Sequence, residues 1–138
     1  MNNASDPSGW IEKARQDARS ARRLLADPAE LEPAAYHVQQ AVEKALKAAL
    51  IAEGIKFPRG KGAGHNLAAL AGLIPAHLPL HQQAQMLTDL TPWATAYRYP
   101  ADDPFTAQSL PAKAEIEIRL AEVEIFIGAV AAQVARPA

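Results

Sequence analysis

The sequence predicts an all-α fold, an up-and-down bundle of four long helices plus a short helix, and three observations support it. Of the 138 residues, 31 are alanine, which has the best intrinsic helix propensity. The 11 prolines leave long gaps with helical periodicity, and a proline inside a helix costs about 3 kcal/mol. Only 6% of the residues are aromatic, which argues against a β-sandwich, because strands favour β-branched and aromatic side chains.

The composition places the whole chain, residues 1–138, in one helical domain with an ordered core over about 8–135. A net charge of −1 and 49% hydrophobic residues are not typical of a disordered chain. The absence of cysteine excludes disulfides, a thiol nucleophile and a thiolate metal site. The N-terminus lacks the pattern of a signal peptide, and no apolar stretch approaches 18 residues. We therefore expect a cytoplasmic protein without a membrane segment.

The first two helices are expected over residues 8–26 and 33–53. In the first, Trp10, Ala14 and Leu24 recur at helical spacing. Gly54 provides a fitting C-terminal stop for the second. The apolar stripe that the second helix is expected to bury consists of Val38, Ala41, Val42, Ala45, Leu46 and Ala49.

Three further elements follow a loop over residues 55–64. A short helix is expected to begin at residue 65 or 66, with Asn66 as its cap, and to end near residue 73. A long helix is expected over residues 80–97, where Thr91-Pro92 kinks or restarts it and Thr91 acts as a cap. A turn-rich loop over residues 99–108 then leads to the last helix, over residues 109–135.

The last helix carries two apolar seams on opposite sides. One seam is expected to face the core and consists of Ile116, Leu120, Val123, Ile127, Val130 and Val134. The second seam consists of Ala114, Ile118, Ala121, Ile125, Gly128 and Ala132. Because a helix at the edge of a bundle needs only one apolar face, we expect the second seam to pack on a second copy in a homodimer. The alternative is that another helix of the same chain covers it.

The glycine-rich segment over residues 54–64 does not match a P-loop, because the spacing of its glycines is wrong and no Ser or Thr follows Lys61. It is interpreted as a flexible surface loop, with a weaker anion-binding role left open for Lys56, Arg59 and Lys61. A basic stripe on the first helix is interpreted in the same way, as a solvated face that permits phosphate contacts without requiring them. Its members are Arg15, Arg19, Arg22 and Arg23.

The four histidines do not indicate a metal site. His37, His77 and His81 lack a metal-ligand spacing with a carboxylate on one face, so we expect neither a metal nor a cofactor. His65 follows the glycine-rich loop and is open to a structural or a catalytic role.

A more specific pattern lies in residues 36–48, where a polar run is interleaved with buried residues of the second helix. The run consists of Gln39, Gln40, Glu43, Lys44 and Lys47. With His65-Asn66-Leu67 and Tyr97-Arg98-Tyr99-Pro100, it resembles the HEPN family (higher eukaryotes and prokaryotes nucleotide-binding). The resemblance implies a bundle of four or five helices that is commonly homodimeric. Prokaryotic members are often encoded beside a minimal nucleotidyltransferase and act as toxin–antitoxin pairs.

Some HEPN proteins are metal-independent ribonucleases, and the resemblance bears on this activity too. That branch uses an arginine, then four to six residues, then a histidine near the last long helix. The matching arginine here is Arg98, and no histidine follows it. Arg59 and His65 are separated by five residues, but His65 already matches the family's His-Asn-Leu element, so we interpret that spacing as coincidental. The usual ribonuclease mechanism is therefore not expected.

Three functional hypotheses remain. The first is a HEPN-like module that binds a nucleotide, an RNA or a partner nucleotidyltransferase through Lys44, Lys47, His65, Arg98 and Tyr99. The second is a ribonuclease that uses Arg98 with a non-standard proton-transfer partner such as His65 or Tyr99. The third is a structural bundle in which Arg98 pairs with a carboxylate, Tyr99-Pro100 ends a helix, and Lys44 and Lys47 only support packing.

Overall fold

The computed structural model describes residues 6–57, 66–95 and 110–135, and every regular element in these ranges is helical. The long helices are α1 (Pro7–Leu24), α2 (Leu31–Ala52) and α5 (Lys113–Val134). The short ones are α3 (Leu67–Gly72), α4 (Pro79–Gln85) and the 3-10 helix η3 (Thr88–Ala94). The predicted all-α class is confirmed.

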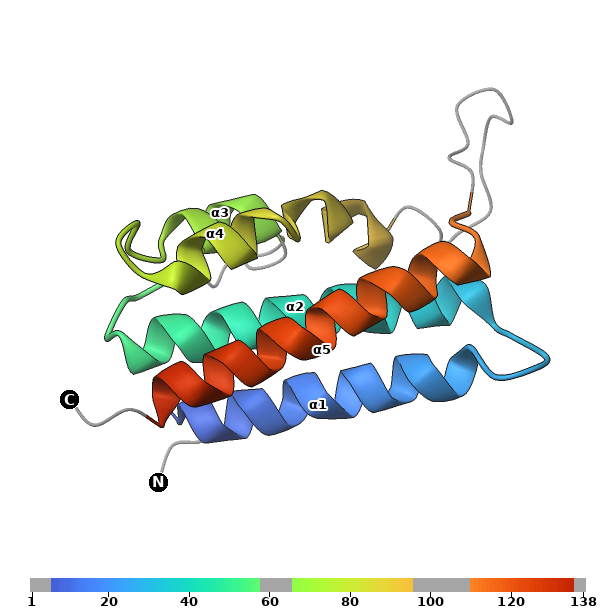
Figure 1. Ribbon diagram of the computed structural model, residues 1–138, viewed down its shortest axis with the longest axis horizontal. Coiled ribbons are helices and arrows are strands. Elements are labelled where there is room, and N and C mark those ends of the chain that lie inside the picture. Colours follow the sequence, from blue (N-terminus) through green and yellow to red (C-terminus); the bar gives the residue numbers. More distant parts are fainter. Residues whose placement is uncertain (1–5, 58–65, 96–109, 136–138) are drawn as a thin grey trace.

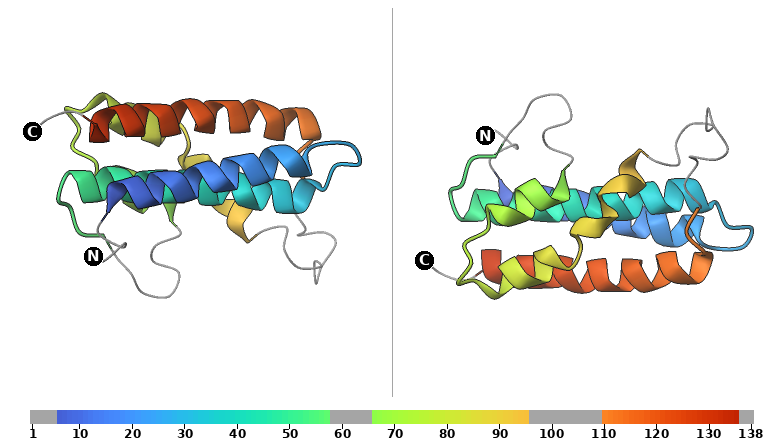
Figure 2. Two further views of the ribbon diagram at one scale, coloured as in Figure 1. Left: turned by 90° about the horizontal axis from the view of Figure 1, so that it is seen from below. Right: turned by 90° about the horizontal axis from the view of Figure 1, so that it is seen from above.

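The three long helices lie side by side, and α5 lies over α1 and α2 (Figure 1). The chain reverses between α1 and α2, so these two helices are antiparallel, while α5 runs in the direction of α2. The shorter α3, α4 and η3 form a row beside α2 and α5 (Figures 1 and 2). The helices pack closely around α2, because its fully buried alanines, such as Ala41 and Ala45, have short side chains.

Local sequence signals account for several helix ends. At α1, the Asp6 side chain accepts a hydrogen bond of 2.9 Å from the Ser8 N–H, and Pro7 occupies the first turn. At α3, Asn66 Oδ1 accepts from the Ala69 N–H at 3.2 Å, which confirms Asn66 as the expected cap. After α2, Gly54 has a φ of 70°, a conformation that glycine adopts without strain. Here too the expected stop is confirmed.

The fourth long helix, expected over residues 80–97, is the main correction to the predicted elements. The chain forms α4, leaves the α-helix at Met86 and continues as η3, with Pro92 inside the 3-10 helix. Thr91 does not cap a restarted helix, since its hydroxyl accepts a hydrogen bond of 3.2 Å from the Leu67 N–H at the start of α3. The described residues therefore contain three long helices, and residues 96–97 lie outside them.

The two seams of α5 have opposite surroundings. The predicted core seam is confirmed, because Ile116, Leu120 and Val123 are fully buried, as is the later Val130. The second seam is exposed along its whole length. Its isoleucines, Ile118 and Ile125, keep 62% and 73% of their surface exposed. The alternative in which another helix of the chain covers this seam is thus contradicted within the described residues.

Candidate functional site

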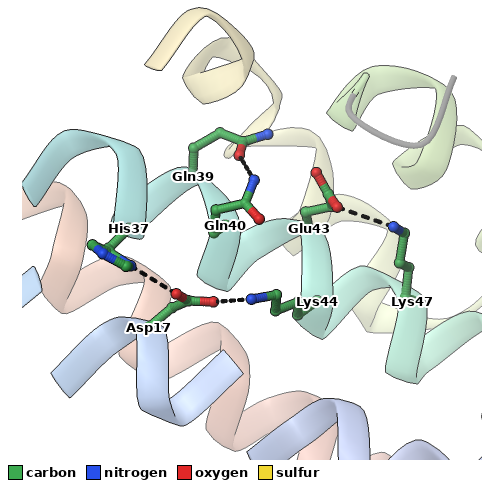
Figure 3. Close-up of polar contacts among 7 residues, drawn as sticks. All are labelled: Asp17, His37, Gln39, Gln40, Glu43, Lys44 and Lys47. Carbon is green, nitrogen blue, oxygen red and sulfur yellow. Dashed lines mark hydrogen bonds and ion pairs between the residues drawn. The ribbon is translucent and has the colours of Figure 1, made fainter. Parts of the chain in front are cut away.

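The polar run of α2 forms a cluster with one residue of α1 (Figure 3). In that view α1 lies alongside α2, and α5 passes behind both. Four members are buried although they are polar: Gln39 has no exposed surface, Glu43 has 3%, Asp17 has 7% and Gln40 has 8%. Buried polar groups are costly unless they are hydrogen-bonded, so their partners decide what the cluster can do.

Asp17 of α1 is the centre of one half of the cluster. Its side chain is 10% exposed, and its two oxygens contact two basic groups. Oδ1 lies 2.8 Å from His37 Nδ1, and Oδ2 accepts a hydrogen bond of 2.6 Å from Lys44 Nζ. Because a carboxylate only accepts hydrogen bonds, this contact assigns the ring hydrogen of a neutral His37 to Nδ1 and leaves Nε2 as its acceptor.

Glu43 and Lys47 form the other half, one turn further along α2. Lys47 Nζ donates to Glu43 Oε2 at 3.0 Å, and the two side chains are only 14% and 5% exposed. The ammonium also lies 5.4 Å from the ring centroid of Trp10 and 5.7 Å from that of Phe57. Cation–π attraction and the ion pair together hold Lys47 in one position.

A hydrogen bond between neighbouring glutamines completes the cluster. Gln40 Nε2 donates to Gln39 Oε1 at 2.8 Å. The cluster thus presents two lysine ammonium groups on successive turns of α2, each fixed by a carboxylate and each with part of its side chain accessible. Such groups are suited to hold an anion, since phosphate oxygens accept hydrogen bonds from ammonium groups that are already oriented.

The predicted site residues have separate outcomes. Lys44 pairs with Asp17 and Lys47 pairs with Glu43, and the side chains of the two lysines are 25% and 14% exposed. His65, Arg98 and Tyr99 lie outside the described residues. In the described ranges, no three His, Asp or Glu side chains gather as a metal site would require.

Asp17 and His37 were missed as members of this site. The carboxylate of Asp17 points from α1 to α2. The spacing contained the necessary information, because Asp17 lies three residues after Ala14 and four before Ala21, both fully buried. A carboxylate on the buried face of a helix requires a basic partner on the facing helix.

The class of protein follows from the fold and this cluster: a helical bundle whose second helix holds a fixed polar row between α1 and the short helices. The model of the HEPN domain matches residues 8–133. The chain therefore belongs to the HEPN domain family.

Two solved structures are similar over nearly the whole chain. TT1696 from Thermus thermophilus is 27% identical with a TM-score of 0.69, and the match covers 95% of this chain and 98% of that one. ST0689, an archaeal HEPN homologue, is 22% identical with a TM-score of 0.64, over 97% and 99% of the two chains. The second likeness concerns the fold alone. The comparison with curated proteins gave no match. Within the described part of the chain, no helix has the length and hydropathy needed to cross a membrane.

Proposed function

We propose that this HEPN chain is a binding module that takes the phosphate groups of a nucleotide or an RNA at the polar cluster of α2. One observation supports this most directly: Lys44 and Lys47 lie on successive turns, each oriented by a buried carboxylate and partly accessible. A lysine that served only as a solvated surface charge would not need a buried carboxylate as its partner, because ion pairs at the surface contribute little to stability.

Three residues outside the described ranges complete the proposed site. His65, Arg98 and Tyr99 belong to the motifs that carry the family resemblance, and an arginine near the α2 lysines would add a bidentate phosphate donor. No histidine follows Arg98, so the proposal assigns binding rather than the usual HEPN ribonuclease chemistry.

Calorimetric titration with nucleoside mono-, di- and triphosphates and with a short single-stranded RNA tests the proposal. Lys44→Gln and Lys47→Gln are each expected to weaken binding about tenfold or more, because charge-assisted contacts to phosphate are lost. Lys113→Gln is the matched control, since Lys113 is exposed and begins α5. Thermal melts must show that the variants fold. Unchanged affinities in both α2 variants would contradict the proposal, and RNA cleavage that requires Arg98 or His65 would replace it with a ribonuclease.

The protein partner belongs to the same proposal. Family membership supports a minimal nucleotidyltransferase encoded beside this chain, as in a toxin–antitoxin pair. Co-expression of the two neighbouring genes, followed by co-elution of the pair, is the test. A neighbourhood without a nucleotidyltransferase gene would count against this partner.

Self-association through the second seam of α5 is proposed as well. The seam remains uncovered in the described residues, and its two exposed isoleucines, which lie two turns apart on one face, favour an interface. Light scattering should give a dimer for the wild type and a monomer for the double variant Ile118→Glu/Ile125→Glu. A wild-type monomer, or a double variant that still dimerises, would exclude this interface.

A further inference from the structure

The outer face of α5 is an uncovered apolar surface among the described residues. No element lies in front of α5 in Figure 1, and α5 forms an edge of the bundle in both views of Figure 2. Ile118 and Ile125 are its most exposed members, and Met86 of the α4 end adds a side chain that is 66% exposed. A surface hollow of about 180 Å³ beside Ile125 is lined by Met86, Leu87 and Phe126. An apolar row of this length is typical of a contact with another protein.

The order of large and small residues along the seam fits a second copy in one orientation. Positions 114 and 132, 118 and 128, and 121 and 125 are each equally distant from residue 123. If two α5 helices cross antiparallel at that level, each isoleucine faces a small residue: Ile118 faces glycine at position 128, and Ile125 faces alanine at position 121. A parallel pair would place isoleucine against isoleucine and glycine against glycine. Because these two levels need different distances between the helix axes, two straight helices could not pack closely at both.

Gly128 provides independent support, because the fold of the single chain does not require it. A Cβ added there would meet nothing within 4 Å, and Gly128 has no positive φ. A glycine inside a helix costs roughly 0.5–1 kcal/mol relative to alanine. An isoleucine from a second copy would occupy the space that the glycine leaves open.

The charged residues on the side of α5 that faces α1, called here the α1 edge, favour the same arrangement. A hollow of about 230 Å³ lies there, lined by Arg15, Arg19, Glu124 and Gly128. Arg22 pairs with Glu124, and this hydrogen bond raises the pKa of the guanidinium above its already high ordinary value. Arg19 pairs with Glu12. In the described part of the chain Arg15 forms no such pair, so its charge remains available.

The antiparallel crossing supplies a partner for Arg15. In an antiparallel pair related by a two-fold axis, the α1 helices of both copies lie on the same side of the contact between the two α5 helices. The crossing places residue 117 of one copy at the level of residue 129 of the other, beside Gly128 and the arginine hollow. Glu117 lies on the α1 edge, since it precedes Glu124 by seven residues, or two turns of α5, and Glu124 contacts Arg22 of α1. Its carboxylate would therefore approach Arg15 of the other copy.

We propose that α5 packs antiparallel on α5 of a second copy about the level of Val123, with Ile118 over Gly128 of the partner subunit and Arg15 paired with Glu117 of the partner subunit. This arrangement rests on the proposed self-association and specifies its orientation and register.

Spin labels on single introduced cysteines test the orientation, and the absence of native cysteine makes the labelling selective. For Ala114→Cys, the antiparallel pair separates the two labels by about 27 Å along the helix axis, because 18 residues rise 1.5 Å each. For Ala121→Cys, the separation along the axis is about 6 Å. Short distances at both positions would indicate a parallel pair and overturn the proposal. A dimer with long distances at both would place the interface elsewhere.

Gly128→Leu tests the register. It fills open space in the single chain, so the monomer should fold with equal or better helix stability, while the dimer dissociation constant rises at least tenfold. Gly72→Leu is the matched control, since a Cβ there also meets nothing within 4 Å. If Gly128→Leu leaves dimerisation intact, the register is wrong even though the dimer stands.

A charge exchange tests the contact between Arg15 and Glu117. Arg15→Glu and Glu117→Arg should each weaken the dimer several-fold, and the double variant should recover most of the loss. Arg23→Glu, on an exposed arginine without a described ion pair, is the control. Single variants without an effect, or a double variant without recovery, would exclude this pair. A wild-type monomer would instead exclude the self-association itself.

Discussion

The carboxylate of Asp17 and the ammonium of Lys44 are 2.6 Å apart, and they join the middle of α1 to the middle of α2. The same carboxylate contacts His37, so one buried acidic group holds two basic side chains of the facing helix. If the proposed phosphate site is correct, Asp17 positions Lys44 for the ligand without contacting the ligand.

Asp17→Asn should lower the free energy of unfolding by about 1–3 kcal/mol. The amide keeps the shape of the side chain but removes the charge, and its single oxygen can accept from Lys44 or from His37 but not from both in a place with little water. Urea denaturation measures the loss. Asp89→Asn is the control, because Asp89 pairs with Arg119 while its side chain is 66% exposed, and a surface pair is worth about 0–1 kcal/mol. Equal losses in both variants would show that the Asp17 cluster has no special role.

The short helix α3 is expected to depend on the apolar residues that it buries. Leu70 is fully buried, whereas Leu73, just after the same helix, is 38% exposed. Leu70→Ala should therefore cost about 2–5 kcal/mol through lost burial and the cavity left behind. Leu73→Ala removes the same atoms and should cost less than half as much in the same urea experiment. A reversed order would mean that α3 does not pack on the core as described.

The long helices could be predicted from the sequence because their information is local. Proline at position 7, glycine at position 54 and the two periodic seams of α5 each mark a boundary or a face without knowledge of the rest of the chain. The lysines of the α2 cluster can also be identified as candidates from the sequence, through the polar run that interrupts an otherwise buried helix.

The remaining features depend on contacts between distant residues. Asp17 and Lys44 are 27 positions apart, so neither residue alone reveals the pair. The break between α4 and η3 falls at Met86 rather than at Thr91-Pro92, because a 3-10 helix accommodates the proline and Arg119 of α5 holds this segment. The guanidinium of Arg119 donates to the Met86 carbonyl at 3.0 Å and to Asp89 at 2.7 Å.

The cap of α3 should be separable from its packing. Asn66→Ala removes the acceptor for the Ala69 N–H and should cost about 1 kcal/mol. The effect should concentrate at the start of α3, where hydrogen exchange of the Ala69 amide becomes faster. Asn66→Asp keeps an acceptor and should restore the protection. If exchange accelerates equally in α3 and α2, the substitution acts on the whole fold rather than on the cap.

The hydroxyl of Thr91 connects η3 to α3 and gives the last prediction. It accepts from the Leu67 N–H at 3.2 Å and donates to the Thr88 carbonyl at 2.9 Å. Thr91→Val has nearly the same shape but neither hydrogen bond, so the buried start of α3 loses the partner of one N–H. We expect a loss of about 1–3 kcal/mol in unfolding free energy, since an unsatisfied buried donor is costly.

Thr91→Ser separates the hydroxyl from the methyl group in this experiment. Serine keeps both hydrogen bonds and should retain most of the stability, while valine should not. Hydrogen exchange of the Leu67 amide provides the local readout, and it should accelerate in the valine variant alone. If serine is as damaging as valine, the methyl contact rather than the hydroxyl joins η3 to α3.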